Sequence, residues 1–267
     1  MKSKLPPRPA INERRAYFEC GYGQLHVRTA FPSTGGFDER TPLLCLHDLG
    51  STSASFAGLI SLMGTDRSIY AIDLPGHGES DSAPKGADVA AFAEAVGDLI
   101  SGLRLREADV LGQGFGAAVA VELAALKDAV IRSVVLVDAP STALAPWPTW
   151  PANEEGAGLD QVFRAGRAQT ADRESLHAYT LRFAEALRSG ARIGAAREAL
   201  GAWPAHERWR QLRHRVLAVD TGRRRPQIAD QIPAGRSLDG SAWPVDSLMA
   251  PTADLAARLR AFLDSIS

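Results

Sequence analysis

Short apolar runs alternate along the chain with polar turns and with stretches that repeat apolar residues at helical spacing. Runs typical of strands buried on both faces occupy residues 42–46, 68–73, 133–138 and 216–219. Stretches typical of helices occupy residues 53–63, 88–103 and 251–266. This order predicts an α/β fold in which a mostly parallel central sheet carries helices on both faces.

Two further segments depart from that alternation. Residues 15–20 and 24–30 indicate two strands joined by a short glycine-containing turn, as in a hairpin. Between the strands predicted at 133–138 and 216–219, helical patterns follow one another without any strand signal. We therefore predict a core formed by residues 1–139 and 211–267, and a helical lid inserted at 140–210.

The stretch from Val110 to Ala124 joins an apolar strand to a helix through a corner containing three glycines. A corner of this shape is typical of a nucleophile elbow, in which a strained position lifts one side chain above the sheet. The lifted position here is Gly114, which carries no side chain.

Three motifs in this order resemble those of the α/β-hydrolase superfamily, in particular its lidded esterase, lactonase and C–C hydrolase branch. Residues 47–50 resemble the oxyanion turn H-G-x-G, with Asp48 in place of the glycine, and residues 73–80 resemble the segment D-x-P-G-x-G-x-S. Residues 112–116 stand at the elbow. The resemblance implies the α/β-hydrolase fold for nearly the whole chain, but it does not establish an activity.

The same resemblance implies that the catalytic triad is degenerate. The nucleophile position falls on Gly114, the acid position on Arg225, and the histidine position on Trp243 and Pro244. Without an imidazole and its carboxylate, a serine hydroxyl has no group to accept its proton. Whether the chain is an enzyme is left open by this pattern.

The resemblance implies that the backbone donors that would bind an anion are preserved. The backbone N–H groups of Leu49 and Phe115 are expected to face one point above the sheet, as in an oxyanion hole. Gln113 and Arg223 are further candidates for contact with a ligand. We therefore expect a small acyl or carboxylate molecule as the ligand, with neither a cofactor nor a metal ion.

Composition narrows the classes of partner. Thirty Lys and Arg residues against 31 Asp and Glu residues leave a formal charge of −1, which gives no field for nucleic acid. No window approaches the roughly 18 apolar residues of a membrane span, so we expect no membrane association and a cytoplasmic protein. The two cysteines form no disulfide or metal pattern. A homodimer or a complex with an active paralogue is left open.

Three functional hypotheses follow. In the first, the chain binds an acyl or carboxylate ligand without hydrolysing it. In the second, it is an atypical cofactor-independent lyase, decarboxylase or isomerase, with His47 or Asp48 as a weak candidate for proton transfer. In the third, it is an unorthodox hydrolase in which a lid histidine, His177 or His206, activates water. The plain alternatives are that His47 and Asp48 only shape the turn and that both lid histidines lie on the surface.

Overall fold

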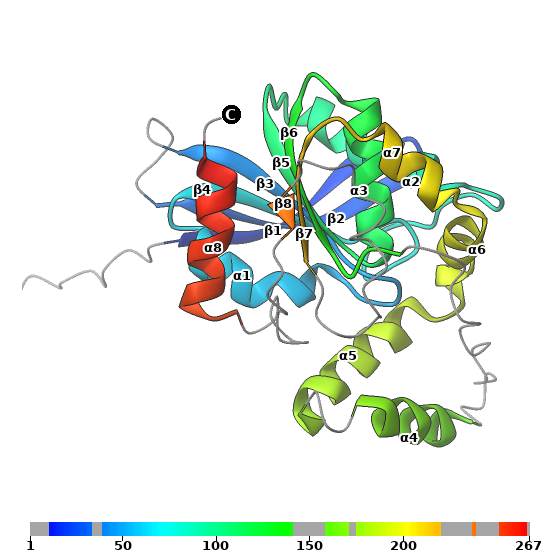
Figure 1. Cartoon of the computed structure of the whole chain (residues 1–267). Helices are drawn as coiled ribbons and strands as arrows, with labels where there is room; N and C mark the ends of the chain where they lie inside the picture. The colour runs from blue at the N-terminus through cyan, green and yellow to red at the C-terminus, as the bar shows by residue number, and fades with distance from the viewer. Residues whose placement is uncertain are drawn as a thin grey trace, which may run out of the picture.

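The computed structural model describes residues 11–33, 39–140, 158–170, 175–219, 237–238 and 251–265. These residues contain an eight-stranded sheet in the order β1-β2-β4-β3-β5-β6-β7-β8 (Figure 1). The strands are β1 (Ile11–Cys20), β2 (Gly23–Pro32), β3 (Arg40–Leu46), β4 (Arg67–Ile72), β5 (Ala108–Gln113), β6 (Ile131–Val137), β7 (Arg215–Val219) and β8 (Ser237–Leu238). Pairing is antiparallel between β1 and β2 and between β2 and β4, and parallel from β4 to β8. The predicted mostly parallel sheet and the predicted hairpin are both confirmed.

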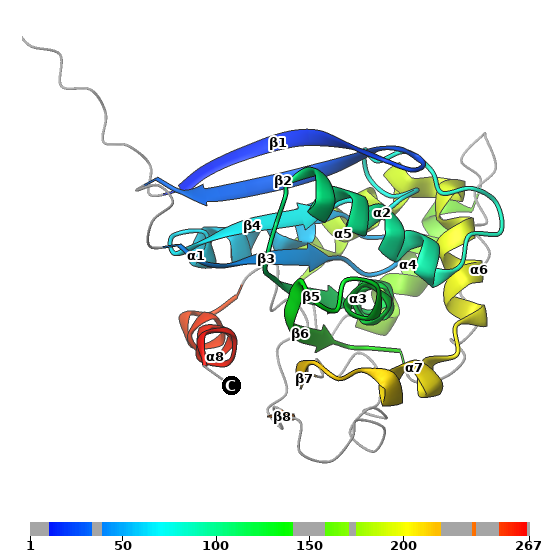
Figure 2. The same cartoon turned by 90° about the horizontal axis from the view of Figure 1, so that it is seen from above.

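Four helices cover the two faces of the sheet. They are α1 (Ala57–Met63), α2 (Val89–Gly102), α3 (Phe115–Leu126) and α8 (Ala253–Asp264). Figure 2 shows α1 and α8 on one face and α2 and α3 on the other. Each face has its own cluster of buried side chains, since the apolar residues of α2 and α3 pack in one cluster and those of α1 and α8 in the other. The segment predicted as a helix at 53–63 begins with a 3₁₀ turn, η1 (Ser53–Phe56), before α1.

The helix that ends the described chain, α8, is held by arginines of the sheet. Arg132 donates to the carbonyl oxygen of Leu263 at 2.6 Å, and Arg215 donates to that of Phe262 at 2.9 Å. These carbonyls belong to the last turn, where a helix has no backbone partners of its own and where its dipole favours positive charge. The contacts fix the last turn of α8 at the amino-terminal ends of β6 and β7, which lie at the opposite end of the strands from the elbow.

The segment between β6 and β7 contains four helices and, among its described residues, no strand. The helices are α4 (Leu159–Thr170), α5 (Leu176–Ser189), α6 (Gly194–Ala202) and α7 (Ala205–Gln211), with a 3₁₀ turn, η2 (Gly190–Ile193), between α5 and α6. Figure 1 shows α4 and α5 projecting from the sheet, whereas α6 and α7 lie beside α2 and α3. The helical character predicted for this segment is confirmed, and its division from the core at residues 140 and 210 stays a prediction. In the described part of the chain, no helix has the length and apolar character needed to cross a membrane.

Candidate functional site

The elbow lies where β5 passes into α3. Gly114 has φ 52° and ψ −114°, a backbone conformation that residues with a Cβ rarely adopt. Its N–H donates to the carbonyl oxygen of Val137 on β6 at 2.9 Å. The flanking glycines permit close packing. A Cβ at Gly116 would lie 2.2 Å from the carbonyl oxygen of Leu46, so the start of α3 is pressed directly against the end of β3. The predicted strand, corner and helix are confirmed.

The turn that follows β3 lies beside this corner, because β3 and β5 are neighbours in the sheet. The N–H of Gly116 donates to the carbonyl oxygen of His47 at 3.1 Å. The backbone N–H groups of Leu49 and Phe115 then converge on a single atom. That atom is Oδ1 of Asp48, which accepts from each of them at 2.8 Å.

The N–H groups of Leu49 and Phe115 thus face one point, which the Asp48 carboxylate occupies, and their role as an oxyanion hole stays a prediction. We expected Asp48 to shape the turn or, as a weak candidate, to transfer a proton, and neither description includes its role as the acceptor of both donors. A ligand oxygen reaches these two N–H groups only if the Asp48 carboxylate leaves them. The signal in the sequence was the aspartate in the position of a turn glycine.

Asp48 and Gly114 depend on each other sterically. A Cβ built on Gly114 would lie 1.8 Å from Oδ1 of Asp48 and 2.1 Å from its Cγ. No real pair of heavy atoms that are not bonded to each other lies this close. The Asp48 carboxylate thus occupies the space that a side chain at position 114 would need, in addition to occupying the two N–H groups.

His47 is fully buried, and both nitrogens of its ring are engaged by backbone groups. Nε2 accepts from the N–H of Leu74 at 3.0 Å, so Nδ1 carries the proton and donates to the carbonyl oxygen of Asp48 at 2.7 Å. Burial lowers the pKa of His47, which keeps the ring neutral. These contacts favour the plain alternative, in which His47 shapes the turn, over a role in proton transfer.

The segment at 73–80 is built around Asp73, as expected for a structural loop. Its carboxylate accepts from the N–H of Ser53 at 2.6 Å and of Glu79 at 3.0 Å, and it pairs with Nδ1 of His26 at 2.9 Å. Burial opposes the ionised form, but these hydrogen bonds hold the pKa of Asp73 below its usual range. Burial and the neighbouring His47 lower the pKa of His77 to about 3.

The end of α5 is fastened to the same edge of the sheet. Thr52 donates to Glu185 at 2.8 Å, and the N–H of Gly78 donates to the hydroxyl of Ser189 at 3.2 Å. Arg192 in turn donates to the carbonyl oxygen of Gly78 at 2.8 Å. These contacts place the end of α5 beside both the oxyanion turn and the 73–80 segment, and a lid over the elbow stays a prediction.

Neither of the two candidate lid histidines lies in a buried site. His177 on α5 and His206 on α7 are both exposed, which agrees with the surface alternative. Gln113 is buried at the end of β5, with 7% of its surface exposed, beside the elbow where a ligand contact was predicted. Arg223, Arg225, Trp243 and Pro244 lie outside the described residues. Within the described ranges, no group of three or more His, Cys, Asp or Glu side chains forms a candidate metal site.

Comparison with known proteins gives partial matches to curated relatives, several of which are hydrolases by name. A serine hydrolase-like protein of Danio rerio is 34% identical over 120 residues, which cover 44% of this chain and 35% of that protein. A pimeloyl-(acyl-carrier protein) methyl ester esterase of Chromobacterium violaceum is 30% identical over 120 residues, covering 45% of this chain and 45% of that protein. The matched segment therefore spans less than half the length of each of these curated relatives.

The fold has relatives among solved structures. The enol-lactonase of Burkholderia xenovorans matches with a TM-score of 0.76 at 17% identity, covering 94% of this chain and 100% of that one. At this identity the likeness concerns the fold alone. A family model described as the alpha/beta hydrolase family matches residues 43–264, a range that begins in β3 and ends with α8. With the elbow, the oxyanion turn and the parallel sheet in their expected order, this chain belongs to the alpha/beta hydrolase family.

Proposed function

We propose that this chain is a non-hydrolysing member of its family that binds a small acyl or carboxylate molecule at the elbow, beneath the helical segment. The observation that carries the proposal is the pair of 2.8 Å hydrogen bonds from Leu49 and Phe115 to the Asp48 carboxylate. The Asp48 side chain occupies the position that we propose for the ligand oxygen, and its two hydrogen bonds mean that these N–H groups accommodate a carboxylate oxygen.

Two features of the site argue against acyl transfer. Position 114 offers no hydroxyl, and the donors that would stabilise a tetrahedral oxyanion already hold a negative charge. The alternative of an enolate-forming enzyme would need a mobile proton near these donors. His47 does not provide it, since both of its ring nitrogens are bound to backbone groups in a fully buried position.

When a ligand carboxylate replaces that of Asp48, the number of hydrogen bonds to the two N–H groups does not change. A ligand carboxylate makes the same two charge-assisted hydrogen bonds that the side chain gives up. Asp48 is only partly buried, so its carboxylate regains water when it swings away. The side chain is then an internal competitor, and the apparent affinity of the ligand is reduced by the fraction of molecules in which the two donors are open.

The relatives agree with this class of ligand. The methyl ester esterase and the enol-lactonase that resemble this chain both act on carbonyl compounds, as their names state. The elbow geometry that this chain shares with its family is suited to holding a carbonyl or carboxylate oxygen above the sheet. We extend only the chemical class of ligand to this chain, without the hydrolysis.

The test is a binding titration with butanoate, hexanoate and hexanamide, followed by calorimetry, on the wild type and on Asp48→Ala. Removal of the competitor is expected to lower the apparent Kd for the carboxylates by about tenfold or more. Glu198→Ala removes an exposed carboxylate on α6 and is expected to leave the Kd unchanged. Equal affinity in wild type and Asp48→Ala, or no binding by either, would overturn the exchange.

A parallel assay tests the absence of hydrolysis. The wild type, Gly114→Ser and the double variant Asp48→Gly with Gly114→Ser are incubated with p-nitrophenyl butanoate. No turnover is expected from any of the three, because the residues matching the acid and histidine positions are Arg225 and Trp243. Turnover by the wild type that disappears with Asp48→Ala would show that the chain is a hydrolase after all.

A further inference from the structure

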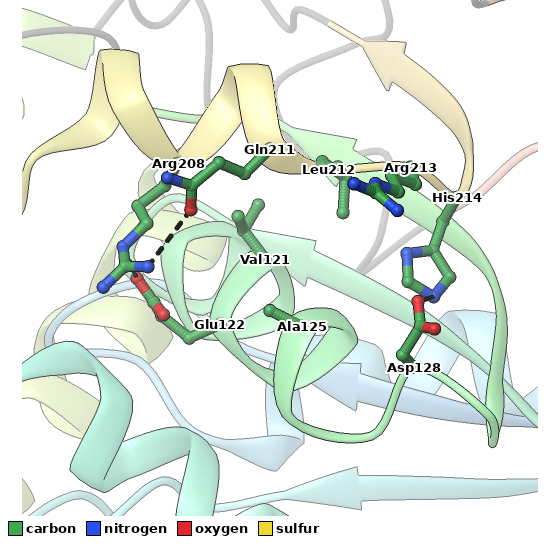
Figure 3. A pocket seen from close by; sticks show the side chains of 9 residues that line it. All are labelled: Val121, Glu122, Ala125, Asp128, Arg208, Gln211, Leu212, Arg213 and His214. Carbon is green, nitrogen blue, oxygen red and sulfur yellow. Dashed lines mark hydrogen bonds and ion pairs between the residues drawn. The ribbon is translucent and has the colours of Figure 1, made fainter.

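A cavity lies at the end of α3 that is away from the elbow. Its volume is about 260 Å³, and Figure 3 shows it between the last two turns of α3 and the segment that joins α7 to β7. The residues that line it are Val121, Glu122, Ala125, Asp128, Arg208, Gln211, Leu212, Arg213 and His214. Ten residues of helix separate Ala125 from Phe115, a distance of about 15 Å along the axis, so this groove and the elbow are different sites.

The middle of the groove is apolar. Val121 and Ala125 lie one helical turn apart on α3, and Leu212 faces them from the segment after α7 (Figure 3). Ala125 is exposed, whereas Val121 and Leu212 are buried. The strip therefore offers a short apolar surface that a small hydrocarbon body can cover.

One end of the groove is closed by a network of polar side chains centred on Glu122. Glu122, with 7% of its surface exposed, accepts from the indole N–H of Trp203 at 2.7 Å and pairs with Arg208 at 3.0 Å. Arg208 also donates to Gln211 at 3.2 Å. The negative charge at this end is neutralised within the protein.

The opposite end contains a cationic side chain, Arg213, together with Asp128 and His214. His214 pairs through Nε2 with Asp128 at 3.4 Å, and only 8% of the His214 side chain is exposed. The other ring nitrogen, Nδ1, is buried without a hydrogen-bond partner, and it points toward Arg213 and Leu212 in Figure 3. Arg213 is exposed and makes no ion pair with the described part of the chain, so its guanidinium is the charge left without a counterion.

We propose that this groove binds a small monoanion with a short apolar body, such as a short-chain carboxylate. The carboxylate pairs with the guanidinium of Arg213 beside His214, and the hydrocarbon chain covers Val121, Ala125 and Leu212. An apolar strip with one charged group at its end is the usual composition of a small-molecule site. A neutral or cationic molecule of the same size leaves the Arg213 charge unsatisfied and binds more weakly.

The experiment is an NMR titration of the ¹⁵N-labelled full chain with hexanoate, hexan-1-ol and hexylammonium. Hexanoate is expected to shift the amides of residues 121–128 and 211–214 in a saturable way, at least tenfold more tightly than the other two. Arg213→Gln is expected to weaken this binding at least tenfold. The matched control Arg210→Gln, an exposed arginine on α7 that does not line the groove, is expected to leave it unchanged.

A second pair of variants tests the apolar strip. Ala125→Trp fills the groove from an exposed position and is expected to abolish the shifts at residues 121–128. Ala57→Trp, at an exposed alanine on the opposite face of the sheet, should not. Binding at the elbow is recognised separately, because it shifts the amides of Leu49 and Phe115 and responds to Asp48→Ala. Shifts confined to the elbow, equal binding of hexan-1-ol, or equal effects of the two arginine variants would each overturn the second site.

Discussion

Substitution of Gly114 by alanine tests the steric dependence between the elbow and Asp48. The added Cβ meets Oδ1 of Asp48 at 1.8 Å, so the carboxylate must leave the N–H groups of Leu49 and Phe115. Two hydrogen bonds to a charged group are lost, and hydration of the displaced carboxylate restores part of their energy, which leaves a cost of about 2 kcal/mol. The sparsely populated backbone conformation of Gly114, with φ 52° and ψ −114°, adds about 1–2 kcal/mol for a residue with a Cβ. We expect Gly114→Ala to lower the free energy of unfolding by about 3–4 kcal/mol.

The steric contribution is isolated by a double-mutant cycle. In an Asp48→Ala background the clash is absent, so Gly114→Ala should cost only the backbone contribution of about 1–2 kcal/mol. The two substitutions should therefore be less destabilising together than their sum, by about 2 kcal/mol. The assay is urea unfolding followed by tryptophan fluorescence, with the midpoint and slope fitted for all four proteins.

A matched control cycle uses Gly86, instead of Gly114, as the glycine that is changed to alanine. Gly86 also has a positive φ, of 81°, but a Cβ there meets nothing within 4 Å. Gly86→Ala combined with Asp48→Ala should be additive within about 0.5 kcal/mol. The reasoning is refuted if the cycle with Gly114 is additive as well, or if Gly114→Ala costs no more than Gly86→Ala.

Two further predictions concern the 73–80 loop. Because an unfolded histidine binds a proton below about pH 6.5 and folded His77 only near pH 3, stability should fall as the pH drops through this window. The fall in the free energy of unfolding is at most about 1.4 kcal/mol per pH unit for His77 and as much again for His47, whose pKa is also lowered. Urea unfolding of His77→Gln between pH 7 and 4.5 should show a weaker dependence of this free energy on pH than the wild type. An unchanged dependence contradicts the assignment. Gly78→Ala should destabilise by about 2 kcal/mol more than Gly86→Ala, since its Cβ would lie 2.1 Å from Oδ2 of Asp73; thermal unfolding that gives equal losses would count against the loop's dependence on Asp73.

The sequence pattern was sufficient for the parts of the fold that repeat. The central strands β4 and β5 are buried along their whole length and carry short apolar runs. The elbow is marked by three glycines, two of which are needed for close backbone contact and one for positive φ. The helix α7 was not predicted. It has only seven residues, of which Ala205 and Trp209 are buried, and two positions are too few to establish a helical period.

The arrangement of Asp48 lay beyond the sequence for a different reason. The bond from Phe115 to Asp48 joins residues 67 positions apart, and it exists because β3 and β5 are neighbours with their ends at one edge of the sheet. The motif indicated which two N–H groups lie together, but a motif does not state where a neighbouring carboxylate points. The charge run at 223–225 and the segment around Trp243 lie outside the described residues, so their predicted roles stay predictions.

The contact between positions 48 and 114 also couples these two residues in any redesign of the elbow. A side chain introduced at 114 meets the Asp48 carboxylate, so it is accommodated only if that carboxylate turns away from the N–H groups of Leu49 and Phe115. A serine introduced at 114 would therefore also free these two donors. Restoring the elbow side chain and opening the donors are thus one structural event rather than two.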